Sequence, residues 1–207
     1  MTLTYAKLAR VSFPFVDRLN DGYSAFSYSS QIIISRAATT AQAAYAKVGN
    51  TVNPGYFAVC NAYEYENATS NMALPPAKRG IDQAGWGNQN TDLSNPDIAY
   101  RMVPIAQSAA PYKLDFYFNV TNQPQFGSTS ATCNNQQRIF NTAITAPPYP
   151  GVFLQGDTAV LKPYFSPKAK TTWTGVYGVK LDVAYHEATA GVKCSTLKGF
   201  HVNAAPA

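Results

Sequence analysis

Lysines and aromatic residues are interspersed in the segment KPYFSPKAKTTWTGVYGVKLDVAY, residues 162 to 185. Lysine side chains attract phosphates, and flat rings stack on unpaired bases, so this combination suits the capture of a single-stranded nucleic acid. Each stacked base contributes roughly 1–3 kcal/mol to such binding. The segment supplies four candidate cations and four candidate stacking rings: Lys162, Lys168, Lys170 and Lys180, with Tyr164, Phe165, Trp173 and Tyr177.

The two halves of this segment differ in pattern. In KPYFSPKAK, prolines flank Tyr164 and Phe165, so these rings are poorly placed for a regular core and are expected at the surface. From Trp173 onward, apolar and polar residues alternate, which predicts a half-buried strand. Trp173 and Tyr177 share the parity of its apolar residues, so we expect them mainly in the core, with base stacking as the alternative. KPYFSPKAK is therefore the predicted nucleic-acid contact.

Four residues elsewhere extend this candidate interface. Tyr117 falls on the polar side of the alternating segment YKLDFYFNVT, beside Lys113. Trp86 lies between two glycines in a predicted loop, and Arg10 lies opposite Val11 in KLARVSF. The set predicts Tyr117 and Trp86 as further stacking rings and Lys113 and Arg10 as further phosphate contacts.

The distribution of charge favours a polyanionic partner. The net charge is +5, although only 13% of the residues are charged. Residues 1 to 99 hold seven basic and seven acidic residues, whereas residues 100 to 207 hold nine basic and four acidic ones. A basic excess confined to one half of the chain is typical of nucleic-acid binding.

Evidence for catalysis or metal binding is thin. The two histidines are His186 and His201, and neither accompanies a recognised nucleophile or phosphate-binding motif. Two alternatives stay open: a Cys194 nucleophile with His201, or a metal site formed by His186, Cys194 and His201, which lacks a fourth ligand at conventional spacing. We predict a protein that is not an enzyme and that carries no metal or cofactor.

Cysteine usage and hydropathy favour a cytoplasmic protein. Cys60, Cys133 and Cys194 are an odd number and lie far apart, which indicates no disulfide framework. The N-terminal residues lack the apolar stretch of a secretory signal, and no apolar run approaches the roughly 18 residues of a membrane span. We therefore expect a reducing compartment and no membrane partner.

Alternating hydrophobicity predicts a mostly-β protein. Strands are predicted in YSAFSYSSQIIISR and YKLDFYFNVT and in the half-segment from Trp173, with weaker candidates in KLARVSFPF, NPGYFAVCNAY and TAVLKPYF. TTAQAAYAKV predicts the one short helix, capped by Thr39 or Thr40 and ended by Gly49-Asn50. Residues 50–105 are expected to form a loop-rich insertion, and residues 122–151 a long loop, within a single domain spanning residues 1–207.

The order of these parts resembles the single-stranded-DNA-binding proteins of tailed bacteriophages. The likeness is closest in RVSFPF, IIIS and FYFNVTNQP and leaves out residues 50 to 105. The resemblance implies an oligonucleotide-binding (OB) barrel that coats and protects single-stranded DNA during replication or recombination, in the cytoplasm of the infected bacterium, with replication or recombination proteins as further partners. Such proteins often end in an acidic tail, whereas this chain has no acidic residue after Glu187.

The same composition permits a structural alternative. Few charges and long loops rich in asparagine and proline are also typical of a β-sandwich or jelly-roll virion or assembly protein, which would form a symmetric oligomer. The two hypotheses differ in whether single-stranded DNA binds.

Overall fold

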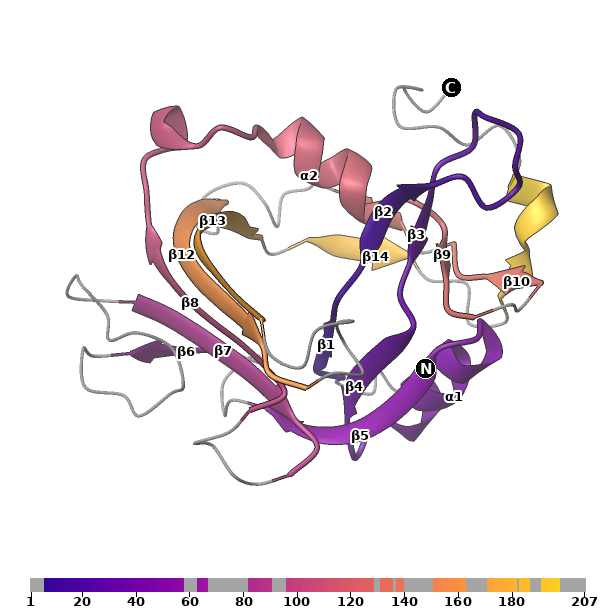
Figure 1. The fold of residues 1–207 in the computed structure, drawn as a ribbon, viewed down its shortest axis with the longest axis horizontal. Coiled ribbons are helices and arrows are strands. Elements are labelled where there is room, and N and C mark those ends of the chain that lie inside the picture. Colours follow the sequence, from indigo (N-terminus) through magenta and orange to yellow (C-terminus); the bar gives the residue numbers. More distant parts are fainter. Residues whose placement is uncertain are drawn as a thin grey trace.

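The residues that the structure describes form a mostly-β fold with two short α-helices (Figure 1). The computed structural model describes residues 6–57, 63–66, 82–90, 96–128, 131–135, 137–139, 151–162, 171–181, 183–186 and 191–197. For residues 63–66, 82–84, 86, 137–139 and 184–186 it describes the backbone alone.

The largest sheet follows the strand order β1-β4-β5-β7-β8-β12-β13, with β6 paired to β7. Neighbouring strands are antiparallel except β4 and β5, which are parallel because helix α1 connects them. The strands are β1 (Leu8–Arg10), β4 (Gln31–Ser35), β5 (Thr51–Phe57), β6 (Tyr63–Glu66), β7 (Asp82–Asn88), β8 (Ile98–Pro104), β12 (Val152–Val160) and β13 (Thr171–Lys180).

This sheet is curled into half a barrel. A Cβ atom added to Gly87 of β7 would lie 3.0 Å from the Cβ of Ala9 in β1, although β4 and β5 separate these strands in the sheet. The face that carries Gly87 is therefore the concave one. Ile33 and Val160 form a buried cluster there, with Val11, Phe57 and Ile98 packed against it. The curled half-barrel is consistent with the OB-like barrel and confirms the expected fold class.

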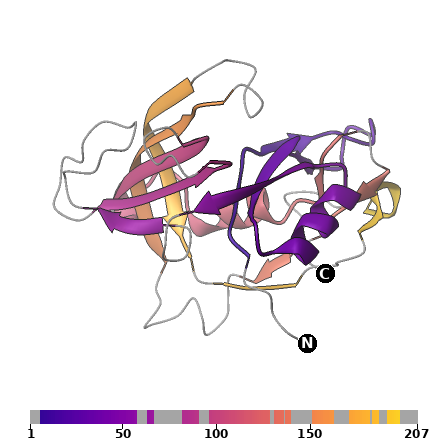
Figure 2. The ribbon, with the colours of Figure 1, turned by 90° about the horizontal axis from the view of Figure 1, so that it is seen from below.

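Helix α1 (Thr39–Lys47) covers the convex face of β4 and β5 (Figures 1 and 2). Ile32 and Ile34 of β4 pack with Tyr45 and Val48 in a buried cluster. The helix ends before Gly49, whose φ of 87° lies in the left-handed region that glycine adopts without strain. The predicted helix and its stop signal are confirmed, but Ala38 occupies the N-cap position and no threonine side chain caps the helix.

Smaller sheets form the rest of the structure. β2 (Phe13–Val16), β3 (Phe26–Tyr28) and β9 (Gln125–Phe126) form one, and β10 (Thr132–Cys133) pairs with β15 (Val192–Lys193). β11 (Gln137–Ile139) pairs with β14 (Ala184–His186). Two 3-10 helices, η1 (Gln107–Ala109) and η2 (Cys194–Leu197), complete the described elements.

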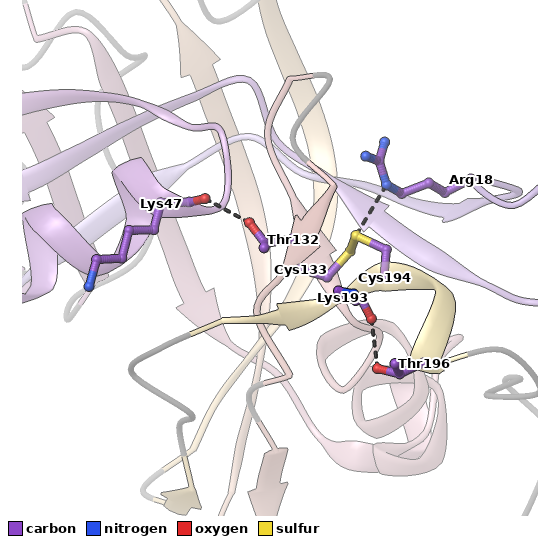
Figure 3. Close-up of a disulfide and its surroundings, with 7 residues drawn as sticks. All are labelled: Arg18, Lys47, Thr132, Cys133, Lys193, Cys194 and Thr196. Carbon is purple, nitrogen blue, oxygen red and sulfur yellow. Dashed lines mark hydrogen bonds between the residues drawn. A yellow bond between two sulfur atoms is a disulfide. The ribbon is translucent and has the colours of Figure 1, made fainter.

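A disulfide joins Cys133 to Cys194, so the expectation that the cysteines form no disulfide was wrong (Figure 3). The pairing of β10 with β15 brings together two residues that lie 61 positions apart in sequence. Both cysteines are buried with Phe26 and Phe126, and Arg18 donates a hydrogen bond from Nε to Cys194 Sγ at 3.3 Å. Cys60 lies outside the described residues. The cysteines therefore no longer support a reducing compartment.

Residues 114 to 121 form a helix rather than the predicted strand. Helix α2 (Leu114–Thr121) begins after Lys113, and Asp115 lies in its first turn, where a negative charge favours helix formation. Apolar residues at every second position of YKLDFYFNVT also recur at spacings of four, as Leu114 and Phe118 do. That spacing also suits a helix, so alternation over so few residues did not distinguish the two structures.

The expected loop-rich insertion at 50–105 contains β5, β6, β7 and β8 of the largest sheet. β7 has the sequence DQAGWGN, and its glycines interrupt the alternation of apolar and polar residues by which a strand is predicted. The expected long loop at 122–151 likewise contains the short strands β9, β10 and β11.

In the part of the chain that the structure describes, no helix is long and apolar enough to span a membrane.

Candidate nucleic-acid interface

The candidate interface centres on the hairpin of β12 and β13. β13 is an end strand of the seven-strand path, and Lys162 follows β12 in a partly exposed position. Tyr164, Phe165, Lys168 and Lys170 lie outside the described residues, so the predicted contact KPYFSPKAK is placed only by its position between the two strands.

A β-bulge in this hairpin places Trp173 and Tyr177 on opposite faces of the sheet. Trp173 pairs with Thr158, whereas Val176 pairs with Gly156, so two residues of β13 face Asp157 alone. Gly175 lies in the bulge with a φ of 66°, and its N–H donates to Asp157 Oδ1 at 3.2 Å. The extra residue reverses the alternation, so the parity shared by Trp173 and Tyr177 no longer means a shared face.

Trp173 lies on the concave face. Its partner Thr158 shares a face with Val160, which belongs to the concave cluster. The side chain is 42% exposed, and no other described ring packs against it. The expectation that Trp173 is a core residue was therefore wrong, and its ring is accessible for stacking.

Tyr177 lies on the convex face in a cluster of rings. Its side chain is 37% exposed, and its hydroxyl accepts a hydrogen bond from Gln155 Nε2 at 3.2 Å. Tyr112 meets it edge-on, with ring centres 6.4 Å apart, and stacks on Phe116 at 4.4 Å. We name Tyr112, Phe116, Tyr117, Phe153 and Tyr177 the convex ring cluster. Tyr177 is thus not a core residue either.

Tyr117 is half-buried within this cluster rather than displayed on a strand. Its ring packs edge-on against Phe116 at 5.4 Å and lies 6.5 Å from that of Phe153 in β12. Its buried hydroxyl has no hydrogen-bond partner in the described part of the chain. Burial, followed by the neighbouring Tyr112, raises the pKa of Tyr117 above the usual 10.0. A ring held this way stabilises the contact between α2 and β12 and is poorly placed to stack on a base.

The substitution Tyr117→Phe is expected to raise the free energy of unfolding by about 1 kcal/mol at pH 7, because it removes a buried hydroxyl that lacks a partner. Because the pKa of Tyr117 is raised in the folded state, the unmodified protein should lose stability as pH rises above 10.0, and the phenylalanine variant should lack this part of the alkaline loss. Urea denaturation at pH 7 and above pH 10 checks both points. A destabilised variant, or an equal alkaline loss in both proteins, would contradict this role.

The candidate cations are dispersed. Lys113 is exposed at the N-terminus of α2, two residues from the exposed Asp115. Lys180 ends β13 and pairs with Val152, which places it on the concave face with Trp173. Arg10 shares the face of Ile32, on the convex side, and its guanidinium donates to Gln125 Oε1. Of these three, Lys180 alone shares a face with Trp173.

Sequence reasoning missed Tyr100, Tyr112 and Phe116. Tyr100 lies in β8 across Thr158 from Trp173, and Tyr112 and Phe116 are exposed on the convex side. Trp86 belongs to β7 rather than to a loop, and its side chain lies outside the described residues. The alternation in IAYRMVP of β8 was the available signal for Tyr100.

The disulfide removes the free thiol that both alternative roles of Cys194 require. Because the disulfide engages Cys194, this residue offers no free thiolate as a nucleophile or a metal ligand. His201 and the side chain of His186 lie outside the described residues. Among the residues that are described, no group of three or more histidine, cysteine, aspartate or glutamate side chains is arranged to hold a metal ion.

Comparison of the chain with models of known protein families, with curated proteins and with solved structures found no match in any of the three.

Proposed function

We propose that this protein binds single-stranded DNA without sequence specificity. The observation that carries the proposal is the exposed ring of Trp173 on the concave face of the curled sheet, in the hairpin that also carries Lys162 and Lys180. An accessible ring stacks on any base, and lysines along the same hairpin attract the phosphates. The basic excess of the second half of the chain supports the same partner.

In this proposal the protein coats and protects single strands during phage replication or recombination. It acts without catalysis, and it recruits replication or recombination proteins. We place this activity in the cytoplasm of the infected bacterium. Disulfides are rare in that compartment, so the oxidation state of Cys133 and Cys194 in protein isolated with its thiols blocked tests the location separately from DNA binding.

Tryptophan fluorescence should fall when oligo-dT is added at low salt, because a base stacked on Trp173 changes the environment of its indole. If the four lysines of the hairpin each contact one phosphate, the logarithm of the affinity should fall with the logarithm of salt concentration with a slope of about −3. Titrations at several salt concentrations measure this slope.

A gel-shift panel of single-stranded DNA, duplex DNA and single-stranded RNA provides the control for this titration. Binding to single strands with weaker binding to the duplex is expected, because stacked and paired bases leave no face open to Trp173. Absence of binding at low salt, or equal affinity for duplex and single strand, would overturn the proposed function.

A virion or assembly role is the second candidate, and Phe13 and Phe15 favour it. Both side chains are about half exposed on β2, at the edge of the three-stranded sheet. Exposed apolar side chains at such an edge suit contact with another subunit. A symmetric oligomer would support this candidate over DNA binding if its mass, measured by light scattering, does not change when oligonucleotide is added.

A further inference from the structure

We infer that Tyr100 and Trp173 form a two-ring stacking platform on the concave face, and that single-stranded DNA lies across this face rather than over the convex ring cluster. The inference rests on the proposed function and goes beyond it by choosing one face of the sheet and by adding Tyr100 to the site.

Glycines line the concave face next to these rings. By strand register, Gly85 is opposite Tyr100, Gly156 is opposite Met102, and Gly178 is opposite Leu154, all on the side of Val160 and Gly87. The absence of a Cβ at these positions makes the floor of the half-barrel shallow. Backbone and flat side chains therefore lie close to any ligand that enters.

Tyr100 lies flat across one of these glycines. A Cβ atom added to Gly85 would lie 2.3 Å from Tyr100 Cε1 and 2.6 Å from its hydroxyl oxygen, so the ring occupies the space directly above Gly85. Met102 likewise lies over a second glycine, Gly178: its sulfur would be 3.2 Å from a Cβ atom added there. Glycine thus holds the Tyr100 ring parallel to the sheet instead of letting it project into solvent.

Trp173 lies in the same row as Tyr100. Thr158 pairs with both residues, one on each side, so the three form a line across β8, β12 and β13. Neighbouring strands lie about 4.8 Å apart, which places the Cα atoms of the two residues about 10 Å apart; the Tyr100 ring lies further from Trp173, because it extends over Gly85 of β7. Two rings at that spacing on a shallow floor can engage two bases of one strand.

The convex ring cluster is less suitable for bases. Tyr112 and Phe116 stack on each other at 4.4 Å, so each ring has one face covered by the other. Tyr177 meets Tyr112 edge-on, and its hydroxyl is engaged by Gln155. These contacts join α2 to the hairpin and leave fewer ring faces accessible.

Charge also favours the concave face. Lys180 lies there, on the same side of β13 as Trp173. A phosphate backbone that runs beside the platform therefore meets this cation on the face that carries both rings.

Oligo-dT titrations of three variants separate the two faces. Trp173→Ala and Tyr100→Leu should each weaken binding by about 5- to 150-fold, the range for losing one stacked base. Tyr177→Ala is the matched control, because it removes an equally exposed ring from the same strand on the other face, and it should change affinity by less than about twofold. Tyr100→Phe keeps the ring and should bind like the unmodified protein.

Gly85→Ala tests the platform without removing a ring. The added methyl would overlap the Tyr100 ring, which must then move away, so binding should weaken although Tyr100 is retained. Cross-linking of bound oligo-dT to the unmodified protein by ultraviolet light gives an answer independent of variant stability. Peptides that contain Tyr100 and Trp173 should carry the nucleotide.

The results of these experiments distinguish a failure of the two-ring platform from a failure of the proposed function. If the unmodified protein binds no oligo-dT, the proposed function itself fails. If it binds, but Tyr177→Ala weakens binding while Trp173→Ala and Tyr100→Leu do not, the function stands and the concave platform is overturned. Cross-links confined to Tyr112 or Tyr177 would overturn it in the same way.

Discussion

The double substitution Cys133→Ala/Cys194→Ala is expected to lower the free energy of unfolding by about 4 kcal/mol. The disulfide joins residues 61 positions apart, and closing a loop of that size restricts the unfolded chain strongly. Both sulfur atoms are also buried in the cluster around Phe26 and Phe126, so their loss removes packing there as well. Guanidinium denaturation of the variant and of the unmodified protein measures the difference.

The same experiment has an internal check in the number of thiols. Three cysteines with one disulfide leave one thiol, so titration of the unfolded, unreduced protein should find one and the reduced protein three. Three thiols before reduction would contradict the disulfide and with it the stability loss.

Oligo-dT binding should survive this loss of stability at temperatures where the variant remains folded. The hairpin that carries Trp173 is held by the pairing of β12 with β8, and η2 lies at the far end of the molecule from it (Figure 2). Loss of binding in a folded, disulfide-free variant would show that the two regions are coupled.

Gly127→Ala is expected to destabilise the protein by about 3 kcal/mol, at the upper end of the usual cost of overpacking. A Cβ atom at this position would lie 2.1 Å from the carbonyl carbon and oxygen of Gly49 and 2.3 Å from Asn50 N. All three are backbone atoms, so no rotamer change relieves the overlap. Hydrogen bonds from Gly127 N to Val48 O and from Ser128 N to Gly49 O, both 2.8 Å, hold the two segments in this contact.

Gly22→Ala provides the matched control for this clash. An added Cβ there meets nothing within 4 Å, but φ is +67°, so only backbone strain of about 1 kcal/mol is expected. Thermal and urea denaturation of both variants should therefore rank Gly127→Ala as clearly the more destabilised. Equal losses would mean that the end of α1 and the segment after β9 can separate without cost.

The sequence predicted the β-rich class and helix α1, because Ile32, Ile34, Tyr45 and Val48 follow the periods of a strand and a helix. It did not predict β7, because glycines at 85 and 87 remove the apolar residues by which a strand is recognised. Their role becomes visible only in the folded sheet, where Tyr100 and Phe57 from neighbouring strands fill the space above them.

Several residues of the candidate site lie in environments other than those that the sequence predicted. Parity grouped Trp173 with Tyr177, because a bulge leaves no mark on alternation except a glycine such as Gly175. Tyr117 was expected on an exposed strand face, yet a helix turned it toward Phe153. The pairing of β13 with β12 decides the first case, and the packing of α2 against β12 decides the second; neither is encoded in local spacing.

The bulge at Gly175 also affects how this protein behaves in a crowded solution. A regular end strand presents evenly spaced N–H and C=O groups on which a second chain can extend the sheet. In β13 the bulge interrupts that spacing. The irregularity that sends Trp173 and Tyr177 to different faces therefore also guards the open side of the half-barrel against aggregation by strand addition.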